Sequence, residues 1–293
     1  MEKNIEFLKY RYIAIVLSIT IFILFLVLGF IRGGMNWGID FVGGVKIIAK
    51  FEKSVDITKI RTELGNQNVT ALVQQIGKEE QNEYIIATKL LNNEEASEDR
   101  SNTIKEALTK VFNVEFLSTE TVGPAIGDFL RQSALKLFVV ALVLITLYLS
   151  FRFEFKYSVG AIAALLHDIM LSIAFCGMTG VEISIPIVAA FLFIFGYSVN
   201  DTIVIFDRIR ENVEVKSKQT FFEVINRSIS QSISRTLLTS LTTMFAVLAL
   251  YILGGDVIND FALVLLFGVI IGTFSSIYIA SPILLAWERF STK

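Results

Sequence analysis

The stretch YIAIVLSITIFILFLVLGFI, residues 12–31, contains no charged side chain. An α-helix needs about 20 mostly apolar residues to cross the roughly 30 Å hydrocarbon core of a bilayer. The stretch is also longer than the apolar region of a cleavable signal peptide, and it lacks a small-residue cleavage site. We therefore interpret it as a spanning anchor, which predicts an integral membrane protein.

Five further stretches have the composition of spans. The second is the shortest, but Lys136 and Arg152 at its ends can extend outward to water and so lengthen it. The six predicted spans are Tyr12–Ile31, Leu137–Phe151, Tyr157–Met178, Ile183–Phe206, Thr236–Gly255 and Phe261–Trp287.

The composition agrees with this assignment and excludes several classes of function. Hydrophobic residues make up 54% of the 293 residues and charged residues only 18%, against about 25% in soluble domains. A net charge of −2 gives no basic field for nucleic acid. One cysteine and one histidine exclude an intrachain disulfide and a Cys- or His-rich metal site. No phosphate-binding loop or nucleophile–base pair is evident, so we expect no enzyme, no cofactor and no metal.

The charges also divide the chain into domains. Residues 32–131 hold 27 of its 54 charged side chains, which predicts a water-soluble domain between the first two spans. Lys and Arg occur in every second segment between the spans and in both terminal segments, whereas the short loops Thr179–Glu182 and Asp256–Asp260 contain neither. Because Lys and Arg are enriched on the cytoplasmic side of a membrane, the N- and C-termini are predicted to be cytoplasmic and residues 32–131 extracytoplasmic. The predicted organisation is an inner segment and first helix (1–31), the outer domain (32–131) and a five-helix bundle (132–293).

The outer domain is predicted to be an α+β domain. Alternation over Val45–Phe51 is typical of a half-buried strand, and Asp56 can cap a helix that follows. Further strands are expected at Val69–Ile76, Glu83–Lys89 and Val114–Glu120, with a polar loop at Asn92–Arg100 and a helix after it. The order βαββαβ predicts a ferredoxin-like sandwich.

Glycines gather where this domain meets the spans. They allow backbone conformations that other residues avoid, so the two junctions are either tight linkers or a hinge on which the domain swings. The candidate hinge residues are Gly38, Asp40, Phe41, Gly43 and Gly44 at one junction, and Gly123 and Pro124 at the other.

Asp168 and Asp201 are the charged residues within predicted spans. A carboxylate at the centre of a spanning helix costs at least about 2.5 kcal/mol, and such groups usually mark an ion or substrate path. The alternative is a buried structural hydrogen bond. Polar residues surround Asp201 in the sequence, namely Tyr197, Ser198, Asn200 and Thr202.

Arg235 is the cation expected to face Asp201. It begins a stripe of hydroxyls on one face of the fifth span, formed by Thr236, Thr239, Ser240 and Thr243, with Thr242 beside it. The alternative for Arg235 is an extended side chain that reaches the membrane surface.

Three further features have simpler interpretations. His167 adjoins Asp168, but neighbours in a helix point about 100° apart, so we expect the two not to share a face and His167 to serve in packing. Apolar residues at helical spacing within residues 213–233 predict an amphipathic segment on the inner membrane surface. Gly268 and Gly272 form a GxxxG pair, a sign of close helix packing.

Four motifs, in order along the chain, resemble one family. Residues 37–44, WGIDFVGG, resemble the G-[IL]-D-F-x-G-G signature of the SecD/SecF protein-export membrane proteins. Residues 196–212, GYSVNDTIVIFDRIREN, resemble the fourth-span block of the SecF members. The third-span motif Leu166-His167-Asp168 and the Arg235–Thr243 stretch also match, and the single outer domain favours a SecF-type member over SecD or a fused SecDF.

This resemblance implies a subunit of the resistance–nodulation–division superfamily in the bacterial or archaeal cytoplasmic (inner) membrane. Family members pair with SecD, and often YajC, beside the SecYEG translocon, and use the proton gradient to pull unfolded exported polypeptide outward. Carried over residue by residue, Asp201 is the proton-carrying carboxylate, Arg235 is its charge partner and Asp168 a further candidate. Some relatives couple to sodium, so sodium is not excluded here.

Two other functions remain open from the sequence. One is half of a proton-coupled small-molecule exporter of the same superfamily, which would hold a substrate cavity in its outer domain. The other is a purely structural assembly subunit, in which neutral replacements of Asp168, Asp201 and Arg235 would be harmless.

Overall fold

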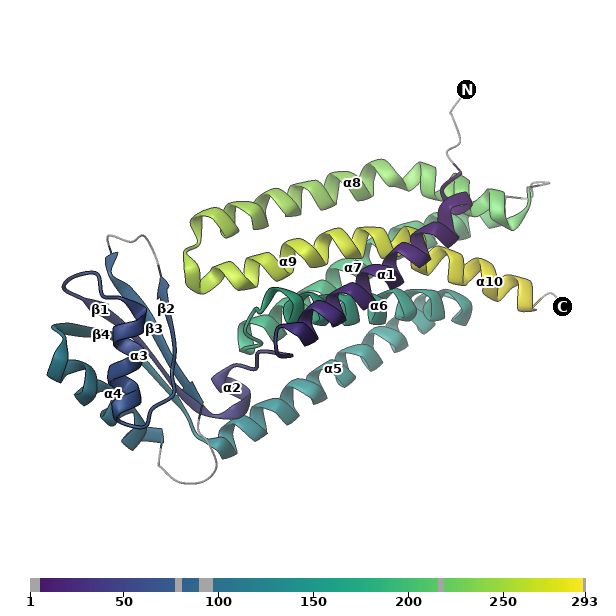
Figure 1. The fold of residues 1–293 in the computed structure, drawn as a ribbon. Coiled ribbons are helices and arrows are strands. Elements are labelled where there is room, and N and C mark those ends of the chain that lie inside the picture. The colour runs from purple at the N-terminus through teal and green to yellow at the C-terminus, as the bar shows by residue number, and fades with distance from the viewer. Residues whose placement is uncertain (1–5, 77–80, 90–96, 216–218, 292–293) are drawn as a thin grey trace. The chain divides into compact units, whose positions relative to one another are not determined.

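The computed structural model describes residues 6–76, 81–89, 97–215 and 219–291. It divides into a bundle unit of residues 1–36, 137–182 and 186–293, and a sheet unit of residues 37–136 and 183–185. Figure 1 labels the elements of both units.

Six helices among the described residues are long and apolar enough to cross a membrane, as predicted. The first is α1 (Arg11–Ile31), preceded by a short 3₁₀ turn at Phe7–Tyr10. The others are α5 (Pro124–Arg152), α6 (Phe155–Thr179), α7 (Ile185–Glu214), α8 (Phe221–Leu253) and α9 (Asp256–Ser275), the last continued by a π turn (Ser276–Ala280) and α10 (Ser281–Ser291). The chain is a multi-pass membrane protein.

Two helices extend well beyond the predicted spans. Helix α5 begins at Pro124 rather than near Leu137. Proline is favoured at the first position of a helix, because the N–H that it lacks would have no partner within the helix there. Helix α8 runs without a break from Phe221, so most of the segment predicted to be separate at 213–233 is continuous with the fifth span. Its apolar side chains Ile225 and Ile229 are fully buried within the protein.

The bundle unit is built around α6. This helix packs against α1, α9, the π turn and α10, and α8 packs along α9 (Figure 1). Small residues allow the closest approaches, since a Cβ at Gly29 of α1 would lie 3.1 Å from the backbone carbon of Gly177 on α6. The predicted GxxxG pair is also a packing face, because Cβ atoms at Gly268 and Gly272 would meet Ile194 and Ser198 of α7.

The sheet unit has the predicted element order. It comprises β1 (Gly44–Phe51), α3 (Ile57–Asn66), β2 (Leu72–Ile76), β3 (Glu83–Lys89), α4 (Ser97–Val111) and β4 (Val114–Val122), after a single helical turn, α2 (Ile39–Val42). The antiparallel sheet has the strand order β2-β3-β1-β4. Alternate strand residues such as Ile47 and Ile86 form a core with Ile60, Leu64 and Leu108 of the two helices.

Some boundaries in the sheet unit differ from the prediction. Asp56 caps α3 as expected, accepting a hydrogen bond from the N–H of Thr58 at 2.8 Å. Strand β2 starts at Leu72 rather than Val69, because Asn68 has a left-handed φ of 57° and Val69 turns back to bond Leu64. Part of the loop expected at 92–100 is the first turn of α4, and residues 92–96 lie outside the described residues.

Candidate functional site

Asp201 lies at a junction of three helices. It is 1% exposed on α7, and its Oδ2 atom lies 3.4 Å from both the Ser240 hydroxyl of α8 and the Thr273 hydroxyl of α9. Those two hydroxyls are 2.7 Å apart. The described contacts of this carboxylate are therefore hydroxyls that can donate to it, with no cation among them.

Asp168 is the centre of a second polar cluster. It is fully buried on α6, and its Oδ2 atom accepts hydrogen bonds from Ser198 of α7 at 2.5 Å and Ser275 of α9 at 2.7 Å. A buried carboxylate is tolerated where several donors satisfy it, and here two neighbouring helices supply them.

His167 is also part of this cluster, contrary to the sequence prediction. Its Nδ1 atom lies 2.8 Å from Oδ1 of Asp168, and its Nε2 atom contacts the hydroxyl of Ser18 on α1. The prediction considered only the directions of the two Cβ atoms. The two Cα–Cβ bonds point about 100° apart. Because Nδ1 is the ring nitrogen nearest the backbone, the carboxylate of the adjacent residue can still come within hydrogen-bond distance of it.

Helices α7 and α9 connect the two clusters. Ser198 contacts Asp168 and lies one turn before Asp201, while on α9 the residues Thr273 and Ser275 face different carboxylates. Gly272 lies between these last two, and a Cβ there would be 3.3 Å from Cα of Ser198. The acids are thus held by the same pair of closely packed helices.

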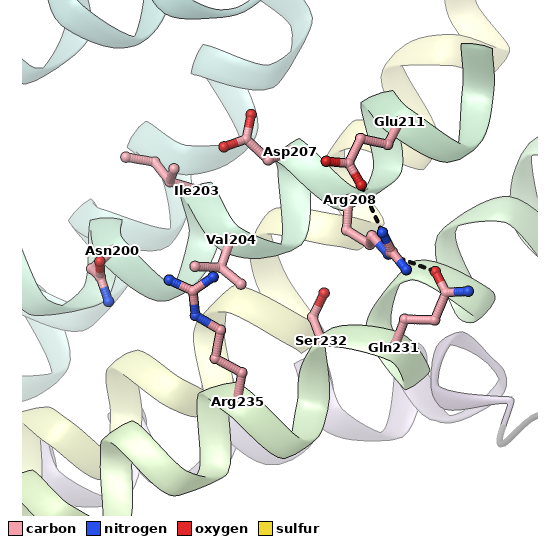
Figure 2. Close-up of a pocket in the computed structure, with 9 residues that line it drawn as sticks. All are labelled: Asn200, Ile203, Val204, Asp207, Arg208, Glu211, Gln231, Ser232 and Arg235. Atoms are coloured by element: carbon pink, nitrogen blue, oxygen red, sulfur yellow. Dashed lines mark hydrogen bonds and ion pairs between the residues drawn. The ribbon is translucent and has the colours of Figure 1, made fainter. Parts of the chain in front are cut away.

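Arg235 does not contact Asp201. Its side chain is exposed, and among the described residues no ion pair or side-chain hydrogen bond is formed by its guanidinium group. Figure 2 shows the guanidinium beside Val204, in a cavity of about 420 Å³ between α7 and α8. The cavity is lined by Asn200, Ile203, Val204, Asp207, Arg208, Glu211, Gln231, Ser232 and Arg235. The pairing of Asp201 with Arg235 expected from the sequence is therefore not formed here.

The other polar residues expected around Asp201 have different partners. Ser198 donates a hydrogen bond to Asp168, and Asn200 lines the cavity of Figure 2. Thr202 and Thr239 bond carbonyls of their own helices. Tyr197 has a buried hydroxyl with no partner in the described residues, and Thr243 is partly buried. Three hydroxyl residues of the two clusters were not predicted from the sequence: Ser18, Thr273 and Ser275. The one sequence signal that marks them is a hydroxyl side chain within an apolar span.

The glycine-rich junction forms specific contacts within the sheet unit. The N–H of Gly38 donates to the carbonyl of Ile183 at 2.8 Å, and the carboxylate of Asp40 accepts from the N–H of Ile185 at 2.8 Å, where α7 begins. Trp37 packs edge-on against Phe41, and Gly43 has a φ of 77°. A Cβ at Gly44 would collide with the Thr88 carbonyl oxygen, and Pro124 lies close to Gly43. A hinge at these residues and Gly123 stays a prediction.

Comparison with known proteins identifies the family. Residues 101–290 match the family described as protein export membrane protein SecD/SecF, C-terminal, and residues 29–55 match the SecD/SecF GG motif. A protein translocase subunit SecF from Desulfurispirillum indicum is 38% identical over 97% of this chain and 92% of its own length. The chain belongs to the SecF family.

Other relatives agree. The SecF subunit of Vibrio alginolyticus is 40% identical over 97% of this chain and 90% of its own length. The crystal structure of Thermus thermophilus SecDF superposes with a TM-score of 0.85 at 35% identity, covering 98% of this chain and 39% of that longer one. A second SecDF structure, in a super-membrane-facing form, gives a TM-score of 0.72 at 34% identity, covering 100% of this chain and 40% of that one. SecF-family membership makes this chain a protein translocase subunit and favours that interpretation over a small-molecule exporter.

Proposed function

We propose that this chain uses the proton motive force to promote a late stage of polypeptide export, with Asp201 as the residue that carries the proton. The observation that supports this most directly is a carboxylate, 1% exposed, at the junction of α7, α8 and α9 with hydroxyls as its described contacts. A proton crossing a potential of 100 mV releases about 2.3 kcal/mol, which is the driving force available for each proton carried.

Protonation of Asp201 would change how these three helices pack. As an anion, the carboxylate accepts from Ser240 and Thr273, which lie 3.4 Å away. As a neutral acid it carries a donor of its own, and its remaining acceptor oxygen attracts the hydroxyl dipoles less strongly because the charge is gone. Ser240 already bonds the Thr236 carbonyl at 2.8 Å, so α8 can release the acid without leaving a hydroxyl unsatisfied.

We propose that the chain works beside a SecD partner, and that Arg235 faces this partner. A cation in a spanning segment is costly unless it pairs with an acid or lines a water-filled space. Arg235 is exposed at the open cavity between α7 and α8. This chain corresponds to only 39% of the Thermus SecDF chain, so the fused relative has room for a companion bundle. We infer that this bundle covers the cavity and supplies a carboxylate to Arg235.

The sheet unit is, in this proposal, an extracytoplasmic ferredoxin-like domain that moves with the proton cycle. Helix α7 starts at Ile185, whose N–H is bonded to Asp40, and the same helix carries Asp201. A shift of α7 therefore acts on the sheet unit through the chain itself. We place both termini in the cytoplasm, the chain in the inner membrane, and the SecYEG translocon and YajC among its neighbours.

The test is gradient-driven export by vesicles that contain this chain, its SecD partner and the translocon. Asp201→Asn keeps the size of the side chain but cannot ionise, and we expect it to remove the gradient-dependent part of export and to leave the ATP-driven part. Glu214→Gln is the control, because Glu214 lies exposed at the end of the same helix and does not line the cavity that holds Arg235. Unchanged gradient-dependent export with Asp201→Asn would refute the proposal. Imposing a sodium gradient in place of the proton gradient identifies the coupling ion.

A further inference from the structure

His167 connects the first helix to the second buried acid. Its side chain is 16% exposed, whereas that of Asp168 is 0% exposed, so the imidazole is the outer member of the pair. One ring nitrogen faces Asp168 at 2.8 Å, and the other contacts the Ser18 hydroxyl of α1. A proton that reaches this pair from α1 therefore meets the imidazole before the carboxylate.

The hydrogen bonds of the pair define two protonation states. While Asp168 is ionised it can only accept, so Nδ1 of His167 carries the hydrogen and Nε2 presents its lone pair to the Ser18 hydroxyl. A proton added at Nε2 reverses that contact, because the new N–H donates to the Ser18 oxygen. The hydroxyl hydrogen then needs a new acceptor. The backbone carbonyl one turn back along α1 can accept it, just as the carbonyl of Val16 accepts from the Thr20 hydroxyl at 2.8 Å.

Both states leave every polar atom of the pair bonded, and the net charge changes from −1 to 0. We propose that His167 and Asp168 form a second proton-binding site, separate from Asp201, which takes its proton at Nε2 of His167 and signals its state to α1 through Ser18. This inference rests on the proposed proton-driven function. It adds a residue of the first helix, which leads directly into the sheet unit, to the parts of the chain that respond to protons.

The groups that contact the His167–Asp168 pair in the described part of the structure are uncharged. The helices around it contribute the hydroxyls of Ser18, Ser198 and Ser275, and the ring of Phe274 lies 6.5 Å from the imidazole. None of the described hydrogen bonds of the pair involves another ionisable group. Among the residues whose side chains the structure describes, the other titratable or charged groups on α6 and on α1, α7, α9, the π turn and α10 are Arg11, Tyr12, Lys156, Tyr157, Cys176, Tyr197, Asp201, Asp207, Arg208, Arg210, Glu211, Glu214, Asp260, Tyr278 and Glu288.

The connectivity Ser18–His167–Asp168 is also that of a hydrolase triad, in which histidine activates a serine nucleophile. Acyl transfer needs donors for an oxyanion and room for a substrate next to the serine. Ser18 is 5% exposed in the middle of α1, where the helix uses the backbone N–H groups, and it does not line the cavity of Figure 2. The geometry favours a proton site over a nucleophile.

The experiment uses the fact that the chain contains one histidine. The full chain, purified through a tag without histidine and labelled with ¹⁵N-histidine, is placed in lipid nanodiscs and its two ring nitrogens are followed by NMR from about pH 9 to 5. We expect an N–H on Nδ1 and a bare Nε2 at high pH, and two N–H groups at low pH. Asp168→Leu should abolish the fixed tautomer, because it removes the acceptor of the Nδ1 hydrogen. Ser18→Ala should shift the Nε2 signal, whereas Thr20→Ala, the control, should leave both signals unchanged.

Several results would overturn this inference. They are a hydrogen on Nε2 at high pH, an imidazole that does not titrate over this range, and a tautomer that stays fixed in Asp168→Leu. Labelling of Ser18 by a serine-directed fluorophosphonate would also contradict it in favour of a nucleophile. In the vesicle assay, His167→Gln should alter the pH profile of gradient-driven export while the subunit remains assembled. Because the NMR result does not depend on transport, it stands or fails independently of the Asp201→Asn test.

Discussion

Gly43 is a position at which a single added methyl group should destabilise the sheet unit through backbone strain. Its φ of 77° and ψ of 147° lie in a region that is essentially restricted to glycine. A residue forced into such a conformation costs of order 1–3 kcal/mol, and a Cβ at Gly43 would also lie 3.1 Å from Cα of Pro124. We therefore expect Gly43→Ala to lower the free energy of unfolding by about 1–3 kcal/mol.

Gly65 provides the matched control. It lies in α3 with nothing within 4 Å of an added Cβ, and alanine is favoured over glycine in a helix by roughly 0.5–1 kcal/mol. The same Gly→Ala change should thus stabilise the unit at Gly65 and destabilise it at Gly43. The assay is urea unfolding of the full chain in detergent, followed by fluorescence of Trp37, which packs on Phe41. Replacing Trp287, the second of the two tryptophans, by Phe makes Trp37 the single reporter. Shifts of the same sign at both glycines would refute the reasoning.

Two further predictions concern carboxylates. The backbone N–H of Thr58 lowers the pKa of Asp56 below its ordinary value of 3.8, so the ionised cap stabilises the sheet unit above about pH 3.8 and this contribution is lost as the pH falls through the lower folded-state value. Acid unfolding followed by circular dichroism should show the stability difference between wild type and Asp56→Asn shrinking over that range; a constant difference would contradict the assignment. Ser275→Ala should reduce gradient-driven export because it removes a donor to Asp168, a kind of hydrogen bond worth about 1.5–3 kcal/mol. Ser276→Ala removes an equally buried hydroxyl that bonds only a backbone carbonyl, and equal effects of the two changes would argue against a role for the donor.

The parts of the fold that depend on local pattern could be predicted from the sequence. Residues 44–51 alternate because one face of a strand is buried, and Asp56 caps a helix through its own backbone neighbours. The spans are recognisable because hydrocarbon excludes charge over a fixed length. Most of the segment predicted to lie along the inner membrane surface, residues 213–233, is instead the first part of α8. Burial of Ile225 and Ile229 depends on contacts that no local pattern reveals.

The two acids of the candidate site could be predicted from the sequence, but the residues that form hydrogen bonds with them could not. Asp168 and Asp201 are conspicuous because charges in spans are costly, and both are buried. Which hydroxyl faces which acid depends on how α9 packs against α7 at Gly272, and the sequence does not fix that rotation. Arg235 was paired with Asp201 on the expectation that opposite charges meet. Helix α7 instead presents Asp201 to the interior and Asn200, its neighbour, to the cavity.

The strand-like contact between Trp37 and Ile183 has a mechanical consequence. Residues 183–185, which lie between α6 and α7, belong with the sheet unit, so the polypeptide passes between the two units four times instead of twice. A force applied to the sheet unit is therefore shared by four covalent tethers, and one of them is the first turn of the helix that bears Asp201. If Asp201 carries a proton as we propose, tension on the sheet unit and protonation of the carboxylate act on the same helix, and each alters the response to the other.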